Sequence, residues 1–161
     1  MFPDELDLRL LKELKSDSRR SVRQLAKSLN ESPSTIYNRV KRLEAKSVIR
    51  SWTVNLDYEQ LEMDHIAFVF VTIDTNFLNG TNHSLRDIID KIKNVVGIHE
   101  MHLLSSEYDL LLKIRGDCAK NIGRLVIEKI RQIPGVSKTV PALSLETIIE
   151  EGELELIPAK K

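Results

Sequence analysis

Residues 32–46 read Ser-Pro-Ser-Thr-Ile-Tyr-Asn-Arg-Val-Lys-Arg-Leu-Glu-Ala-Lys. Ser32 followed by Pro33 is typical of a helix start. Serine accepts a backbone N–H as the N-cap, and the first helical position needs no N–H of its own. Three apolar residues then recur at helical spacing and predict one buried face: Ile36, Val40 and Leu43. The stretch therefore predicts a helix over most of its length.

The opposite face of this helix is polar and basic. At about 100° per residue it carries Ser34, Asn38, Lys41 and Arg42, flanked by Thr35 and Arg39. Short polar side chains near a helix N-terminus can reach base edges, whereas arginine and lysine reach guanine acceptors or phosphates. This face therefore predicts contact with the major groove of DNA.

The residues before this stretch predict two further short helices. Leucines at helical spacing indicate the first over about residues 4–15, and the second covers about residues 21–29 with Ser21 as its N-cap. Two short helices joined by a tight turn, the second basic outside, predict a helix-turn-helix. The alternative is a small helical bundle with a solvated basic face. Residues 48–55 alternate and are rich in β-branched side chains, so they predict the strand or wing that often follows such a motif.

The net charge of zero hides two regions of opposite sign. Residues 1–50 hold twelve Lys or Arg and seven Asp or Glu, a balance of +5, and residues 51–161 carry −5. Within residues 19–50 the balance rises to +7. Taken alone, a net charge of zero argues against a nucleic-acid partner, but the asymmetry indicates a basic module joined to an acidic one.

The rest of the chain predicts alternating strands and helices. Strands are expected at 66–73, 95–104, 108–115 and within 136–149, with the first strand buried on both faces because it is continuously apolar. Helices are expected after Ser84 and Asp117, and a loop at 79–82. The order βαββαβ predicts a ferredoxin-like layer in an α+β protein. The helices cover only one face of such a sheet, so the other face would leave apolar residues exposed. We expect a second subunit to cover it.

These patterns divide the chain into four parts. They are a helix-turn-helix domain at 1–47, a linker strand at 48–62, a ferredoxin-like domain at 63–149 and an acidic C-terminal segment at 150–161.

Several function classes are disfavoured by composition. The single cysteine, Cys118, excludes an internal disulfide, and no apolar run approaches the ~20 residues of a membrane helix. A cytoplasmic protein without a membrane partner is therefore expected. His99, Glu100 and His102 are the one cluster with metal-ligand chemistry, but residues 99 and 102 of a strand face opposite sides. We expect no metal, no cofactor and no catalytic residues.

The chain resembles the Lrp/AsnC (feast/famine) transcription regulators over nearly its whole length. The motifs that carry the resemblance are Leu6-Asp7, Leu25-Ala26, Ser32-Pro33-Ser34-Thr35, Arg39-Val40-Lys41-Arg42-Leu43-Glu44, Ser105-Ser106-Glu107-Tyr108-Asp109 and Ile133-Pro134-Gly135-Val136. The resemblance implies a winged helix-turn-helix joined to a ferredoxin-like effector domain. It also implies homodimers formed by sheet pairing, with further assembly, commonly into octamers.

The resemblance also implies a small effector, typically an amino acid, bound between dimers. The residues expected to bind it are Ser105, Ser106, Glu107, Tyr108, Asp109 and Gly135. Ser106 stands where the family usually has glycine, which narrows the space for a ligand and disfavours positive φ. Asp109 can accept a hydrogen bond from an α-ammonium group.

The leading prediction is a regulator that binds a pseudo-palindromic double-stranded DNA operator. Candidates for base edges are Ser34, Thr35, Asn38 and Arg42; Ser32 lies beside them as the N-cap. Candidates for phosphates are Arg19, Arg20, Arg39, Lys41 and Arg50. The alternatives are a sirohaem-decarboxylase-like enzyme on the same scaffold, and an assembly or sensing module with vestigial DNA binding.

Overall fold

A computed structural model describes residues 3–150 of the chain. The chain divides into two compact units, an N-terminal one that extends to Asn55 and a C-terminal one from Leu56 to Ile148. The predicted acidic segment at 150–161 lies, apart from Glu150, outside the described residues.

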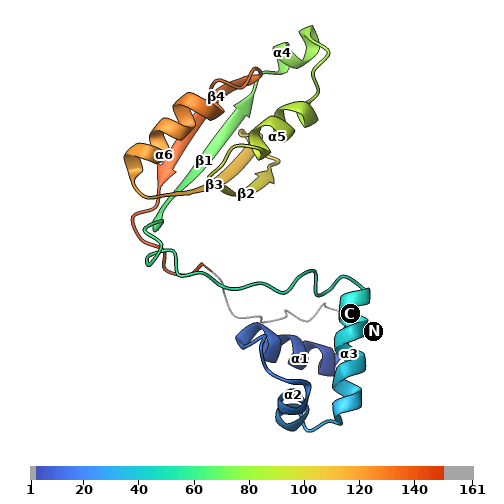
Figure 1. The fold of residues 1–161 in the computed structure, drawn as a ribbon. Coiled ribbons are helices and arrows are strands. Elements are labelled where there is room, and N and C mark those ends of the chain that lie inside the picture. Colours follow the sequence, from blue (N-terminus) through green and yellow to red (C-terminus); the bar gives the residue numbers. More distant parts are fainter. Residues whose placement is uncertain (1–2, 151–161) are drawn as a thin grey trace. The chain divides into compact units, whose positions relative to one another are not determined.

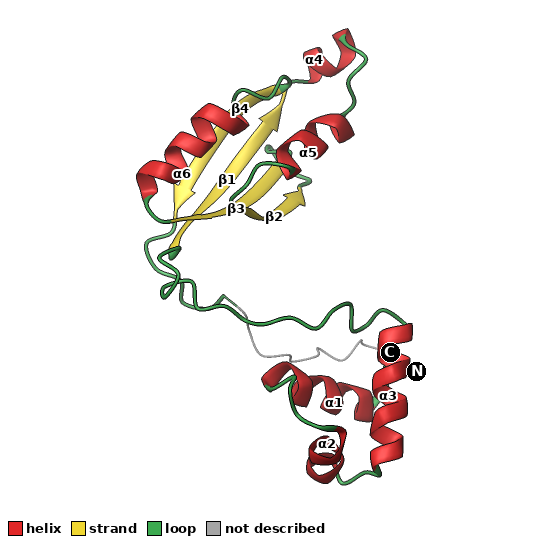
Figure 2. Cartoon of the chain, in the orientation of Figure 1, coloured by secondary structure: helices red, strands yellow, loops and turns green. Residues whose placement is uncertain are grey.

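The N-terminal unit contains the three predicted helices, α1 (Glu5–Ser16), α2 (Val22–Leu29) and α3 (Pro33–Ala45) (Figures 1 and 2). Each begins after a side chain that accepts a backbone N–H of the first turn: Asp4, Ser21 and Ser32. In α1 and α2 the third helical residue bonds back to the N-cap, which completes a capping box. The structure confirms the predicted arrangement of two short helices joined by a tight turn.

Apolar residues from all three helices form one small core. They are Leu10, Leu14, Leu25, Ala26, Leu29, Ile36 and Leu43. The turn between α2 and α3 is tight because Asn30 takes a left-handed conformation, with φ 57°. This turn sets the direction in which α3 leaves α2.

The prediction of a strand at residues 48–55 is wrong for the single chain. These residues lie outside any strand, because no neighbouring edge in the described part of the chain pairs with them. Trp52 still ties the segment to α3, since its indole N–H donates to the Glu44 carboxylate over 3.0 Å.

The C-terminal unit is a four-stranded antiparallel sheet in the order β2-β3-β1-β4. The strands are β1 (His65–Ile73), β2 (Ile98–Leu103), β3 (Leu110–Gly116) and β4 (Val136–Leu143). Helix α5 (Leu85–Lys93) joins β1 to β2, and α6 (Ala119–Leu125) continues as the π-helix η1 (Val126–Ile130) before β4. This is the predicted ferredoxin-like topology. The structure adds a short helix, α4 (Thr75–Gly80), where the sequence predicted a loop over part of the segment.

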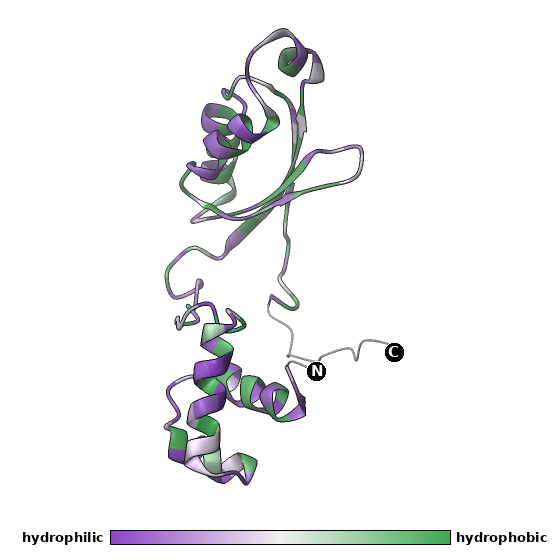
Figure 3. Cartoon of the chain, turned by 90° about the vertical axis from the view of Figure 1, so that its right-hand side faces the viewer, coloured by the Kyte–Doolittle hydropathy of each residue, from purple (hydrophilic) through white to green (hydrophobic). Residues whose placement is uncertain are grey.

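The two faces of the sheet differ in cover. Helices lie on one face of the sheet (Figure 3). These are α5 and α6, and under them Val69, Val71 and Leu112 are fully buried. On the other face Phe68 is 39% exposed, and Phe70 is half-buried. The prediction that β1 is buried on both faces is therefore wrong for the single chain, because helices cover only one of them. We call the apolar residues Phe68, Phe70, Leu111 and Val140, which the strand register places on this second side, the open face.

Candidate functional site

The outward face of α3 is polar and exposed, as its helical spacing predicted. The exposed residues that follow one another along this face are Ser34, Asn38 and Lys41. Tyr37, which the sequence reasoning missed, is 53% exposed beside them. The predicted face was defined by polar and basic side chains, so an aromatic residue was not included in it. An exposed tyrosine nevertheless offers a hydroxyl and an apolar ring edge to a partner.

Three hydroxyls meet at the N-terminus of α3. Ser32 Oγ accepts the backbone N–H of Thr35 over 3.1 Å. The same oxygen lies 2.9 Å from Ser34 Oγ and 2.8 Å from Thr35 Oγ1. Ser32 is therefore engaged as the cap, while Ser34 and Thr35 carry hydroxyls at the end of the helix where orphan backbone donors also point.

Arg39 and Arg42 are held by two carboxylates from the start of α1. Arg39 bonds to Asp7 Oδ1 over 3.0 Å and also to the Asp4 carboxylate. Arg42 bonds to Asp7 Oδ2 over 2.6 Å and lies 3.5 Å from Asp4 Oδ2. The Asp7 side chain is completely buried. These arginines therefore help to join α3 to α1, besides the DNA contact predicted for them.

The ion pairs shift the titration of both partners. The Arg39 guanidinium holds the pKa of Asp4 well below its usual range, helped by the hydrogen bond from the Asp7 backbone. In turn, hydrogen bonds to Asp4 and then to Asp7 raise the pKa of Arg39. Asp4 and Arg39 therefore both carry their charges near neutral pH.

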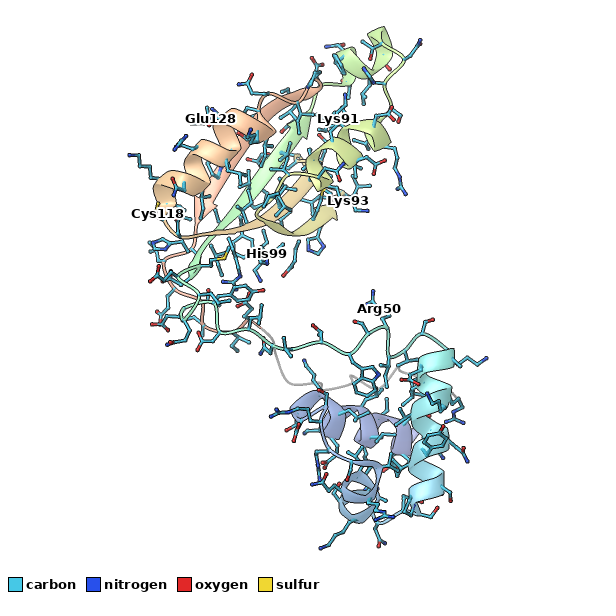
Figure 4. All side chains as sticks on the ribbon, in the orientation of Figure 1. Arg50, Lys91, Lys93, His99, Cys118 and Glu128 are labelled. Carbon is cyan, nitrogen blue, oxygen red and sulfur yellow. The ribbon has the colours of Figure 1, made fainter. Side chains whose placement is uncertain are left out.

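The other predicted phosphate contacts lie on separate elements. Arg20 pairs with Glu13 of α1, and the Lys41 ammonium donates to Glu44 over 3.1 Å. Arg19 is exposed in the turn before α2, and Arg50 extends from the segment after α3, away from the helices (Figure 4). The structure thus gives Arg20 and Lys41 acidic partners within their own unit.

The predicted effector residues gather at one end of the sheet. Asp109 Oδ2 accepts the backbone N–H of Ile73 over 2.7 Å, at the end of β1. The next residue, Asp74, donates its N–H to the carbonyl of Gly135 over 2.8 Å. The end of β1 therefore brings the loop with Asp109 and the turn with Gly135 together.

Gly135 has a structural reason to be glycine. Its φ is +96°, and a Cβ there would lie 2.3 Å from Ile88 Cδ1 and 3.0 Å from Phe77 Cδ1. The positive φ therefore disfavours a side chain at this position, and a Cβ would also require Ile88 and Phe77 to shift.

The loop before Asp109 folds on itself and over the open face. Ser106 Oγ accepts the Tyr108 N–H over 3.3 Å and lies 3.1 Å from the Tyr108 carbonyl. Ser106 is not among the described residues with positive φ, so serine fits there without backbone strain. The Tyr108 ring packs on Phe70 with 5.0 Å between centroids, and a hydrogen bond with the Glu107 carboxylate raises the Tyr108 pKa.

The cluster at residues 99–102 is part of a polar network. Glu100 Oε1 accepts from Lys113 over 3.0 Å, and Glu100 Oε2 lies 3.4 Å from His102 Nε2. These contacts, the lysine first, lower the pKa of Glu100. The His99 ring packs edge-on against Tyr58 instead. In residues 3–150 no three acidic, histidine or cysteine side chains lie together as a metal site would need. Nor does any described helix have the length and apolarity to span a membrane.

Two family models match the chain in sequence. Residues 4–44 match the AsnC-type helix-turn-helix domain, and residues 66–154 match the Lrp/AsnC ligand binding domain. An HTH-type transcriptional regulator of Pyrococcus horikoshii is 36% identical over 148 residues, which cover 92% of this chain and 96% of that protein. The proline dehydrogenase transcriptional activator of Rhizobium radiobacter is 31% identical over 149 residues, covering 92% and 93%.

The fold agrees with a solved member of the same group. AsnC of E. coli superposes with a TM-score of 0.83 at 20% identity, over 94% of this chain and 98% of that one. The chain therefore belongs to the Lrp/AsnC family of helix-turn-helix transcriptional regulators, whose members bind DNA.

Proposed function

We propose that the chain recognises a specific operator through the outward face of α3, inserted in the major groove. The observation that carries the proposal is the exposed row of Ser34, Asn38 and Lys41, which follows three hydroxyls at the N-terminus of α3. Ser34, Thr35, Asn38 and Arg42 contact base edges in this proposal. The spacing of a helix in the groove allows such short side chains to read adjacent base pairs.

Phosphate contacts supply affinity rather than sequence choice. Arg19 and Arg50 suit this role because both are exposed. Lys41 is exposed as well, and its pairing with Glu44 is a surface contact that a phosphate can replace at little cost. Arg39 is the least available for phosphate in the unbound chain, since its side chain is 23% exposed and bonds to both Asp4 and Asp7.

We propose that two chains pair through the open face and read a pseudo-palindrome. The supporting observation is the row of apolar side chains on the open face, which the single chain leaves without the helix cover of the other face. Two-fold pairing would set half-sites about one helical turn, ~10 base pairs, or a multiple apart. Dimers then assemble further, as an octamer in the fullest case.

An amino acid is the proposed effector. A structure of a transcriptional regulator from Neisseria meningitidis, solved as a complex with L-Met, superposes with a TM-score of 0.85 at 21% identity, over 96% of this chain and 97% of that one. Here the end of β1 joins Asp109 to Gly135, and Asp109 Oδ1 accepts no bond from the described residues. That oxygen suits an α-ammonium group.

Binding and response can be tested together. Fragments of genomic DNA bound by the full chain are selected with and without a panel of amino acids. We expect enrichment of a pseudo-palindrome and a change in occupancy with at least one amino acid. No enrichment at any salt concentration contradicts DNA recognition, whereas enrichment that no amino acid alters contradicts the effector alone.

Regulation without catalysis fits this site better than the decarboxylase alternative. A sirohaem-decarboxylase-like enzyme has no need for an exposed polar face on α3, which this chain has. Reconstitution with sirohaem should give no bound-cofactor absorbance, and an absorbance band would favour the enzyme. The chain is proposed to act in the cytoplasm, beside the DNA that it regulates.

A further inference from the structure

Four charged side chains join the first turn of α1 to one flank of α3. Asp4 and Asp7 provide the carboxylates, and both contact Arg39 and Arg42. The arginines lie three residues apart on α3, so they present neighbouring guanidinium groups on one side of the helix. This flank borders the exposed row proposed to enter the groove.

The two carboxylates differ in how much they are buried. The Asp7 side chain is fully buried, whereas that of Asp4 is 39% exposed. Removing Asp7 would leave two arginines beside a buried gap, which disrupts the contact between the helices. Asp4 lies at the surface, so its charge can be removed with far less disturbance.

The charge of Asp4 is separable from its capping role. Asp4 Oδ1 accepts the backbone N–H of Asp7 over 3.0 Å, while Asp4 Oδ2 faces the arginines. Asparagine caps helices as well as aspartate does, because its side-chain oxygen accepts the same bond. Asp4→Asn therefore keeps the cap and removes the anion.

A carboxylate and a phosphate offer arginine the same partner, a pair of anionic oxygens. On a non-cognate duplex the phosphates are the main anionic partners for the α3 arginines, and phosphate contacts supply essentially all non-specific binding. An internal carboxylate competes with those contacts. On the operator Arg42 is proposed to turn to a base edge instead, and the base contacts of Ser34 and Asn38 are untouched, since neither residue takes part in the ion pairs.

We propose that Asp4 is a specificity-determining residue of the DNA interface. Its carboxylate competes with DNA phosphate for Arg39 and Arg42 and so suppresses binding that does not depend on sequence. The inference rests on the proposed DNA recognition by α3. It adds a role for a residue outside the helix-turn-helix pair, at the start of α1.

The test compares Asp4→Asn with the unmodified full chain on two duplexes. One is the duplex most enriched in the selection above, and the other has a random sequence of equal length. Affinity is measured by fluorescence anisotropy at a series of salt concentrations. The variant should bind the random duplex several-fold more tightly, with a salt slope steeper by about one. The ratio of enriched to random affinity should fall.

Glu5→Gln is the matched control. Glu5 is an exposed acid in the same turn of α1, and no described side chain pairs with it. The substitution changes net charge by the same amount. Equal gains in both variants would mean a general charge effect and would overturn the proposal.

A purely structural role predicts a different pattern. If Asp4 only stabilises the fold, Asp4→Asn should bind both duplexes more weakly, with an unchanged ratio of the two affinities, and that result overturns the proposal. Asp4→Ser, which also keeps an N-cap, serves as the second variant and should repeat the gain on random DNA. Failure of the unmodified chain to bind any duplex refutes DNA recognition itself, which the unmodified arm reveals separately.

Discussion

The two units of the chain handle charge and apolar surface in opposite ways. The N-terminal unit packs its three helices around a small apolar core and buries the carboxylate of Asp7 between α1 and α3, while α3 has a polar face exposed. The C-terminal unit leaves an apolar face of its sheet open, with Phe68 39% exposed. The outward face of α3 suits a polyanion, and the open face of the sheet suits another protein surface. Substitutions confined to one unit therefore test whether the two surfaces have separate roles.

The largest effect is expected from Leu43→Ala in the N-terminal core. Leu43 is fully buried, and truncation of such a leucine costs about 2–5 kcal/mol. A unit with so few core residues has a small free energy of unfolding, so this loss should unfold much of it. The fluorescence of Trp52, the one tryptophan, should report early unfolding, and amide exchange should rise over α1–α3. Equal loss of protection in β1–β4 would contradict independent units.

Gly135→Ala should produce the converse result in the C-terminal unit. Positive φ together with the close approach of Ile88 predicts a loss of about 2–4 kcal/mol. Amide exchange should rise in β1 and β4 while α1–α3 stay protected. Gly80→Ala is the control, because a Cβ at Gly80 meets no atom within 4 Å. If both variants were equally stable, the packing argument for Gly135 would fail.

Phe70→Asp should break the proposed pairing of the open face. A charge at the centre of an apolar interface should weaken association by at least about 2 kcal/mol, or about 30-fold. Light scattering should show a mass close to the 18.5 kDa of one chain. Val96→Asp places the same charge at an 88% exposed position outside the strands and should leave the mass unchanged. An unaltered mass for Phe70→Asp would place the interface elsewhere.

The smallest effect concerns acid sensitivity of the N-terminal unit. The folded pKa of Asp4 lies below its unfolded value near 3.9, so its contribution to stability is present above about pH 4 and is lost as pH falls. Because the side chain is 39% exposed, that contribution is at most about 1 kcal/mol. Melting followed by Trp52 fluorescence should show the unmodified chain and Asp4→Asn converging between pH 5 and pH 2, as ~1 kcal/mol of difference disappears. If the difference in stability between the two proteins stayed constant over this pH range, the ion pair between Asp4 and Arg39 would not contribute to stability.

Local patterns explain which parts of the fold could be predicted. Ser21 and Ser32 cap their helices as expected, because capping depends on residues only three positions apart. The order of strands and helices was enough to predict the sheet topology. The segment at 48–55 was predicted wrongly because alternation indicates a tendency to form a strand but not a partner for it.

The site was predicted less completely for a similar reason. The spacing on α3 placed Ser34 and Asn38 outward, as found. No local pattern could pair Arg39 with Asp7, which lies 32 residues earlier in the chain. Gly135 was expected at the effector site by resemblance alone, and the structure adds a positive φ and close packing that favour glycine. Contacts between side chains that are far apart in the chain cannot be predicted from local sequence patterns.

The most direct test of the account is a selection from a random duplex library with the full chain and with Asn38→Ala. Asn38 is exposed on the outward face of α3 and takes part in no ion pair, so its loss should alter base recognition alone. The account predicts a pseudo-palindrome for the unmodified chain. The variant should lose preference at one position in each half-site, with the salt slope unchanged. The same preference at every position for both proteins would contradict reading of the groove by this face.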